Sequence, residues 1–183
     1  EAVAYNTNSY IKYDFLLPED DVKKKLEAIN LLRIARYAGN IESSLDVGTA
    51  TGRYPGIFRA LGAKAHGIDI SSDAIEYANT KFYGMDNHPV LKVGNATNID
   101  YPDNTFDIVT CMMGTFIHIA VEDQPLALRE MYRVCRPGGV VAVSTWDLDC
   151  PHLTFLSMYS VREDELIISN SRSVNETNKL FSD

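Results

Sequence analysis

Leu45-Asp-Val-Gly-Thr-Ala-Thr-Gly52 decides the fold, because an apolar strand here runs into a loop of small residues and then into a helix. Few side chains obstruct such a loop, and glycine tolerates positive φ, so the backbone can turn tightly and approach a ligand closely. The stretch therefore predicts a nucleotide-type cofactor site. A dinucleotide fingerprint needs a small residue five positions after its first glycine, but here Arg53 stands five positions after Gly48, which argues against NAD.

Strands and helices alternate along the chain around this stretch. Short β-branched runs predict strands, and apolar residues at helical spacing predict the helices between them. The strands are apolar on both faces, as parallel strands covered by helices must be. The fold class is therefore α/β, a doubly wound, Rossmann-like and mainly parallel sheet. The expected strands are 44–47, 65–70, 90–93, 106–112 and 140–145, and the expected helices are 22–38, 54–61, 71–82 and 123–135.

Length and composition limit the class of protein. The 183 residues suit one domain, and 45% apolar with 23% charged residues is typical of a soluble protein. No apolar run approaches the roughly 20 residues of a membrane span, and the first residues are not signal-like. We therefore expect a cytoplasmic protein with no membrane partner. The net charge of -8 also argues against a nucleic-acid partner.

The cysteines and acidic residues do not suggest a disulfide framework or a metal site. Three cysteines without a Cys-x-x-Cys pair are typical of reduced thiols. Asp147, Asp149 and His152 follow the fifth expected strand. Metal-dependent proteins of this wider fold place acids after the fourth strand, where this chain has Met112 and Met113. We therefore expect no bound metal.

The motifs, in this order, resemble those of the class I S-adenosylmethionine-dependent methyltransferases, especially the small-molecule branch of types 11 and 25. The resemblance covers about 44–146. Ala50 stands where the loop of the family usually has its middle glycine, a change that is absorbed only if its φ is negative. Asn95 stands where the family usually has Asp. The matching stretches are Leu45 to Gly52, His66-Gly-Ile-Asp69-Ile-Ser, Val93-Gly-Asn95-Ala96, Phe106 to Met113, and Glu130 to Gly139.

The resemblance implies S-adenosylmethionine as the cofactor and S-adenosylhomocysteine as its product. Asp69 follows Gly48 by 21 positions, close to the spacing at which an acid at the end of the second strand accepts both ribose hydroxyls. A helix-capping role is the alternative for Asp69. Asp46 is expected to fix the loop near the methionine part of the cofactor, or to serve the loop structurally. The expected cofactor-binding residues are Asp46, Gly48, Thr49, Ala50, Gly52, Asp69, Ile70, Asn95, Ala96 and Met112.

Methyl transfer from a sulfonium is an in-line displacement, so a base is needed only when the acceptor must lose a proton. His118, after the fourth strand, is the candidate catalytic base, with a structural role as the alternative. Aromatic side chains can cover a planar acceptor or the sulfonium. The candidate substrate-binding residues are Tyr5, Tyr10, Tyr13, Met113, His118 and Trp146.

The sequence predicts one methyltransferase domain over 1–183, acting on a small organic acceptor through O, N or C. Its parts are an arm and helix forming a lid (1–40), a cofactor-binding core (41–146), and a substrate-side segment with a final helix (147–183). The alternatives are a cofactor-binding protein without methylation activity, an RNA methyltransferase, and an aminopropyltransferase.

The carboxyl-terminal end of the chain carries a separate expectation. The family that the motifs resemble usually has an antiparallel strand pair after its last helix, and we expect this chain to lack that pair because it ends where the pair should begin. We therefore expect either a fragment of a longer protein or a protomer whose exposed fifth strand pairs with another chain, as in a homodimer.

Overall fold

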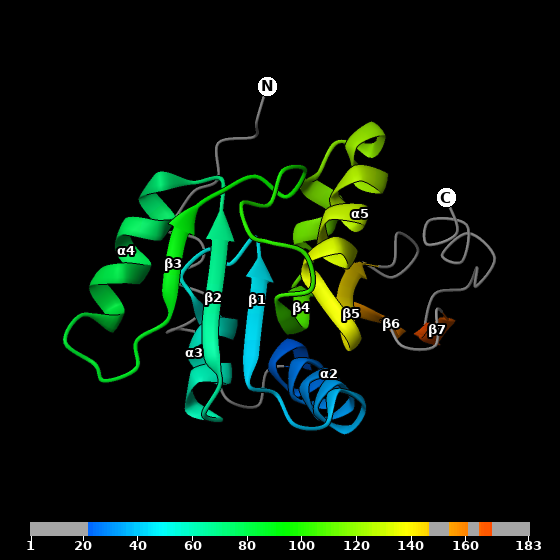
Figure 1. The fold of residues 1–183 in the computed structure, drawn as a ribbon, viewed down its shortest axis with the longest axis horizontal. Helices are drawn as coiled ribbons and strands as arrows, with labels where there is room; N and C mark the ends of the chain where they lie inside the picture. Colours follow the sequence, from blue (N-terminus) through cyan, green and yellow to red (C-terminus); the bar gives the residue numbers. More distant parts are fainter. Residues whose placement is uncertain (1–21, 147–153, 161–164, 170–183) are drawn as a thin grey trace.

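A computed structural model describes residues 22–146, 154–160 and 165–169, and shows a sheet covered by helices on both faces (Figure 1). The strand order is β3-β2-β1-β4-β5-β6-β7, in which β1 to β5 pair in parallel and β6 and β7 pair antiparallel. The α/β class is thus confirmed. The strands are β1 Ser43–Val47, β2 Lys64–Asp69, β3 Val90–Val93, β4 Phe106–Cys111, β5 Cys135–Trp146, β6 Thr154–Ser160 and β7 Glu165–Ser169.

The helices begin and end close to the predicted positions. Ser71 caps α4, since its Oγ accepts a hydrogen bond from Ala74 N at 3.2 Å. Pro125 lies in the first turn of α5, where its missing N–H costs nothing. Among the described residues, no helix has both the length and the apolar content that a bilayer crossing needs. The helices are α2 Val22–Ala38, α3 Arg53–Ala60, α4 Ser72–Phe82 and α5 Gln124–Val134, with short 3-10 helices η1 Thr115–His118 and η2 Val121–Asp123.

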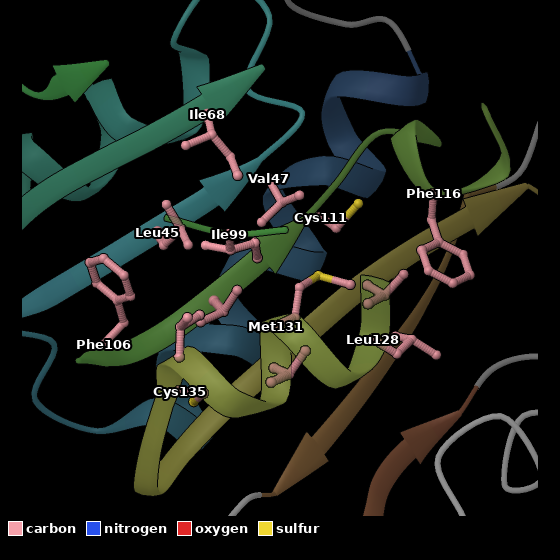
Figure 2. Packing of buried hydrophobic residues seen from close by; sticks show 14 residues of the cluster. Leu45, Val47, Ile68, Ile99, Phe106, Cys111, Phe116, Leu128, Met131 and Cys135 are labelled. Carbon is pink, nitrogen blue, oxygen red and sulfur yellow. The ribbon is translucent and has the colours of Figure 1, made fainter. Parts of the chain in front are cut away.

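Alternate residues of the central strands supply two cores, one on each face of the sheet. Val141 and Val143 belong to the cluster that contains Met131 of α5, which Figure 2 shows in front of the sheet. Val140 and Ala142 belong to the opposite cluster, with residues of α2 and α3. Every residue of β4 is buried, as a central parallel strand requires.

Two antiparallel strands follow β5, so the expectation that the chain lacks such a pair is wrong. The β5–β6 register runs from Val140↔Ser160 to Trp146↔Thr154, and β7 pairs with β6 on the far side. The edge of β5 is therefore covered within the same chain. Residues 154–160 read Thr-Phe-Leu-Ser-Met-Tyr-Ser, which has neither the strand nor the helix period, so local pattern did not reveal a strand set by pairing with β5. The expected final helix lies outside the described residues.

The buried carboxylate of Asp107 joins three elements at the amino-terminal end of β4. Its Oδ2 accepts hydrogen bonds from the backbone N of Glu42 and of Ser43, both at 2.7 Å. Its Oδ1 forms an ion pair with Arg136 Nε at the start of β5. A carboxylate that is only 2% exposed is tolerable because both oxygens have partners.

Replacing Asp107 tests this junction. Asp107→Asn removes the charge and leaves one acceptor oxygen, so we expect it to lower the free energy of unfolding by about 2 to 4 kcal/mol in urea titrations. Asp103→Asn is the matched control, because Asp103 is 67% exposed and its pair with Arg133 is worth at most about 1 kcal/mol. Equal losses in the two variants would contradict the account.

Glu130 and Arg133 of α5 hold the loop between β3 and β4. Glu130 Oε2 accepts a hydrogen bond from Ile99 N at 2.8 Å, and Arg133 donates to the carbonyls of Ile99 and Tyr101 at 2.8 and 2.9 Å. The hydrogen bond from Arg133 is the main cause that lowers the pKa of the Glu130 carboxyl below its usual value. The ionised pair therefore stabilises a loop that has no regular structure of its own.

The lowered pKa of Glu130 gives a pH prediction. Because the folded-state pKa lies below the unfolded-state value, the contribution is present above the ordinary carboxyl pKa and is lost as the pH falls through the folded-state value. Thermal melting of Glu130→Gln and the wild type should therefore differ most at neutral pH and converge in acid. A difference between the two that is independent of pH would contradict this assignment.

Candidate functional site

A pocket opens at the carboxyl-terminal ends of the central strands, where ligands bind in doubly wound sheets. It is formed by the loop after β1, the end of β2 with the start of α4, the segment after β3, and η1 after β4. The structure thus brings together residues from four separate strand ends. The candidate residues that line it are Gly48, Ala50, Asp69, Ile70, Asn95, Ala96 and His118.

The glycine-rich loop is anchored to β2 rather than to its own strand. Gly48 N and Thr49 N both donate to Ile68 O, at 2.8 and 2.9 Å. Gly48 and Gly52 each have φ +74°, a conformation that favours glycine. A Cβ on Gly52 would also lie 2.8 Å from the Phe82 ring of α4. The two glycines are therefore required by the shape of the loop.

Ala50 takes the left-handed conformation as well, with φ +45°. The negative φ that would have absorbed its methyl group is therefore not found. An L-residue in this region costs about 1 to 2 kcal/mol. The conformation aims Ala50 N at Asp69 Oδ2, with a hydrogen bond of 2.7 Å. The loop keeps a strained residue at a point where it contacts the pocket, as is common at functional sites.

Asp69 links the loop after β1 to the start of α4. Its Oδ2 accepts from Ala50 N, and its Oδ1 accepts from Ser71 N at 2.9 Å. Ser71, not Asp69, caps α4, so the capping alternative for Asp69 is wrong. A carboxylate oxygen can accept more than one hydrogen bond, so both oxygens retain capacity for a donor from a ligand.

The segment after β3 closes the far end of the pocket. Asn95 Oδ1 accepts a hydrogen bond from Thr97 N at 3.0 Å, which fixes the turn. This bond uses the amide oxygen of Asn95 and not its amide nitrogen. Ala96 adds a small apolar wall beside it. The lining here combines an amide with small side chains, which is compatible with an aromatic base.

Several candidate cofactor residues support the pocket without lining it. Asp46 is 2% exposed and accepts a hydrogen bond from Thr110 Oγ1 at 2.6 Å, which agrees with the structural alternative for this acid. Thr49 and Gly52 are buried within the loop. Met112 belongs to the core cluster of α2 and α3, and Met113 packs against the same cluster. Met112 comes directly after β4 and belongs to the same cluster as Ile108, so it packs in that core and does not line the pocket.

The remaining candidate residues lie outside the part of the chain that the structure describes. Tyr5, Tyr10 and Tyr13 lie outside the described residues, as does the side chain of Trp146 at the end of β5. In the proposed lid, the described helix α2 contacts β5 and β6. None of the residues that line the pocket comes from α2. The lid over 1–40 therefore stays a prediction.

Sequence reasoning missed Thr115, which lines the pocket beside His118. Its Oγ1 lies 2.9 Å from Met112 O and 3.3 Å from Gly48 O. Met113 and Gly114 have φ +58° and +80°, so the chain turns sharply after β4 and brings Thr115 back over the loop. The Gly114-Thr115 pair after a buried strand was the available signal for such a turn.

Comparison with known proteins agrees with this geometry. Residues 45–143 match the family described as "Methyltransferase domain". The demethylmenaquinone methyltransferase of Listeria welshimeri is 34% identical over 125 residues, 66% of this chain and 50% of that protein. The malonyl-[acyl-carrier protein] O-methyltransferase of Yersinia pestis is 33% identical over 104 residues, 55% of this chain and 35% of that protein.

Solved structures share the fold. CalS10, an amino pentose methyltransferase from Micromonospora echinaspora solved with S-adenosylmethionine bound, superposes with a TM-score of 0.62 and 18% identity, covering 87% of this chain and 71% of the other. The chain spans about half the length of the demethylmenaquinone methyltransferases that it matches. The family match, however, covers more than half of this chain. The chain therefore belongs to the methyltransferase-domain family, within the class I S-adenosylmethionine-dependent methyltransferases that its motifs resemble.

Proposed function

We propose that this protein transfers a methyl group from S-adenosylmethionine to a small organic molecule. The observation that carries the proposal is the Asp69 carboxylate, which is hydrogen-bonded to the glycine-rich loop and lines one pocket together with Gly48 and Asn95. An acid that can bind a ribose, a loop that admits close approach of a ligand, and a surface for the base are the three parts that a nucleoside cofactor needs.

The order of the strands supports one orientation of the cofactor. The strands β3, β2, β1 and β4 are neighbours in that order in the sheet. Their carboxyl-terminal ends place four pocket residues in the same order, namely Asn95, Asp69, Gly48 and His118. The adenine would lie over β3 and the ribose would bind Asp69. The methionine part would then extend over Gly48. This orientation directs the methyl group toward the loop after β4.

The proposed mechanism depends on placement rather than on a nucleophile of the protein. In-line displacement needs the acceptor atom, the methyl carbon and the sulfur aligned in a site that excludes water. His118 lines the pocket on the β4 side, where a base could remove a proton from a hydroxyl or amine acceptor. We propose this role only for acceptors that must lose a proton.

The acceptor is proposed to be a small molecule, because the named relatives act on small or carrier-bound organic groups.

A homodimer is no longer needed to cover β5, since β6 occupies that edge. Among the described residues, Cys111 and Cys135 are free buried thiols, which supports the predicted cytoplasmic location.

Cofactor binding is tested by titration calorimetry of the chain with S-adenosylhomocysteine. We expect micromolar or tighter binding, about 8 kcal/mol, none with NAD, and a loss of at least tenfold in affinity for Asp69→Ala because the ribose loses its acceptor. Asp73→Ala is the matched control, since Asp73 is exposed in the first turn of α4. Tight binding of NAD, or equal affinities in both variants, would contradict the proposal.

Methyl transfer separates the enzyme from the cofactor-binding alternative. Binding of S-adenosylhomocysteine without turnover of labelled S-adenosylmethionine across a panel of quinol, sugar and amine acceptors would favour a protein that binds the cofactor without methylating. Turnover by a decarboxylated donor alone would favour an aminopropyltransferase.

The strain at Ala50 gives an independent prediction. Ala50→Gly removes the cost of positive φ in the loop, so we expect thermal melting to rise by about 2 to 4 °C, the shift that 1 kcal/mol produces in a chain of this size. Affinity for S-adenosylhomocysteine should be retained or increased, because the backbone path and the Ala50 N–H remain. Ala60→Gly, in the last turn of α3 where helical φ makes glycine unfavourable, should lower the melting temperature. A fall in both variants would contradict the role assigned to the φ of Ala50.

A further inference from the structure

We infer that Thr115 is a positioning residue that fixes the distance between the cofactor loop after β1 and the acceptor-side loop after β4. The inference rests on the proposed function and deepens it. The single hydroxyl proton of Thr115 is shared between carbonyls of both loops, with Met112 O at 2.9 Å and Gly48 O at 3.3 Å from Oγ1. It also lines the pocket between Gly48 and His118.

The packing between the two loops is close as well as polar. A Cβ added to Gly48 would collide with Thr115 Cγ2 and would lie 3.1 Å from its Cβ. Gly48 and Thr115 are therefore a matched pair, in which the missing side chain of one makes room for the branched side chain of the other. Because the methyl and the hydroxyl of Thr115 leave the same carbon, one rotamer sets both the contact and the hydrogen bonds.

The backbone after β4 is built to hold Thr115 in this place. Thr115 N donates to Met112 O at 3.2 Å, and the left-handed Met113 and Gly114 return the chain toward β1. Without the Thr115 side chain, η1 and His118 would lose this contact with the loop after β1. The Thr115 hydroxyl connects η1 to the cofactor loop at Gly48 O. At the other end of η1, the Gln124 amide donates to Phe116 O and Ile119 O.

The position of Thr115 predicts which part of the cofactor depends on it. In the proposed orientation, adenine and ribose lie over β3 and β2, far along the pocket from Thr115, and the amino-acid part lies over Gly48. Loss of the hydroxyl should therefore affect ligands that carry the amino-acid part. Ligands that end at the thioether should be almost unaffected.

Calorimetry with two probes, S-adenosylhomocysteine and 5′-methylthioadenosine, tests the inference. Thr115→Val keeps the shape and removes the hydroxyl, so its affinity for S-adenosylhomocysteine should fall about tenfold, while 5′-methylthioadenosine binding should change less than about twofold. Thr115→Ser restores the hydroxyl and should recover most of the affinity. Thr80→Val is the matched control, because Thr80 Oγ1 donates to Glu76 O within α4, away from the pocket.

Each outcome of this experiment is decisive. Equal affinities of the wild type and Thr115→Val for S-adenosylhomocysteine, or equal losses for both probes, would overturn the positioning role while leaving the proposed function intact. Failure of Thr115→Ser to recover affinity would overturn the part assigned to the hydroxyl. A wild-type chain that binds neither probe would overturn the proposed function itself, and the inference with it.

Discussion

The Asp69 carboxylate accepts one backbone N–H from the loop after β1 and another from the residue that caps α4. The first hydrogen bond joins the ends of the neighbouring parallel strands β1 and β2, and the second fixes the turn from β2 into α4. Together with the hydrogen bonds from Gly48 N and Thr49 N to Ile68 O, the bond from Ala50 N holds the loop in its left-handed conformation. Asp69 is thus part of the loop's support, and it also lines the pocket where the ribose is proposed to bind.

The rest of the sheet supports this arrangement from both faces. Parallel strands bring their carboxyl ends to one edge, so the residues after β1, β2, β3 and β4 meet without any of them being close in sequence. Residues of α5 cover one face and residues of α2 and α3 cover the other, which leaves the central strands buried on both sides. At the opposite end of the sheet, Asp107 joins the β1, β4 and β5 strands through backbone and arginine contacts. The two acids thus act at opposite ends of β1.

Much of the fold and part of the site could be read from the sequence, for physical reasons that differ between residues. The strand 106–111 is a short, mainly apolar run, and α4 begins after Ser71 at the expected cap, so both could be predicted from local signals. Asp69 was accessible through its spacing from Gly48. The β6 strand was missed because its seven residues have no clean period and are defined by pairing with β5. Met112 was predicted at the cofactor but lies in the core cluster of α2 and α3, because the burial of β4 on both faces hides from the sequence which side the next residue faces. Thr115 was missed because its role arises from a left-handed turn that brings two distant loops together.

The central claim is that the pocket at the ends of β1 to β4 holds S-adenosylmethionine with its ribose on Asp69 and its methyl group toward η1. A crystal structure of the protein grown with S-adenosylhomocysteine tests it most directly. The account predicts the ribose hydroxyls within hydrogen-bond distance of the Asp69 oxygens, adenine beside Asn95 and Ala96, and the sulfur between Gly48 and His118. A ligand bound elsewhere, or bound in the reverse direction along the pocket, would contradict it.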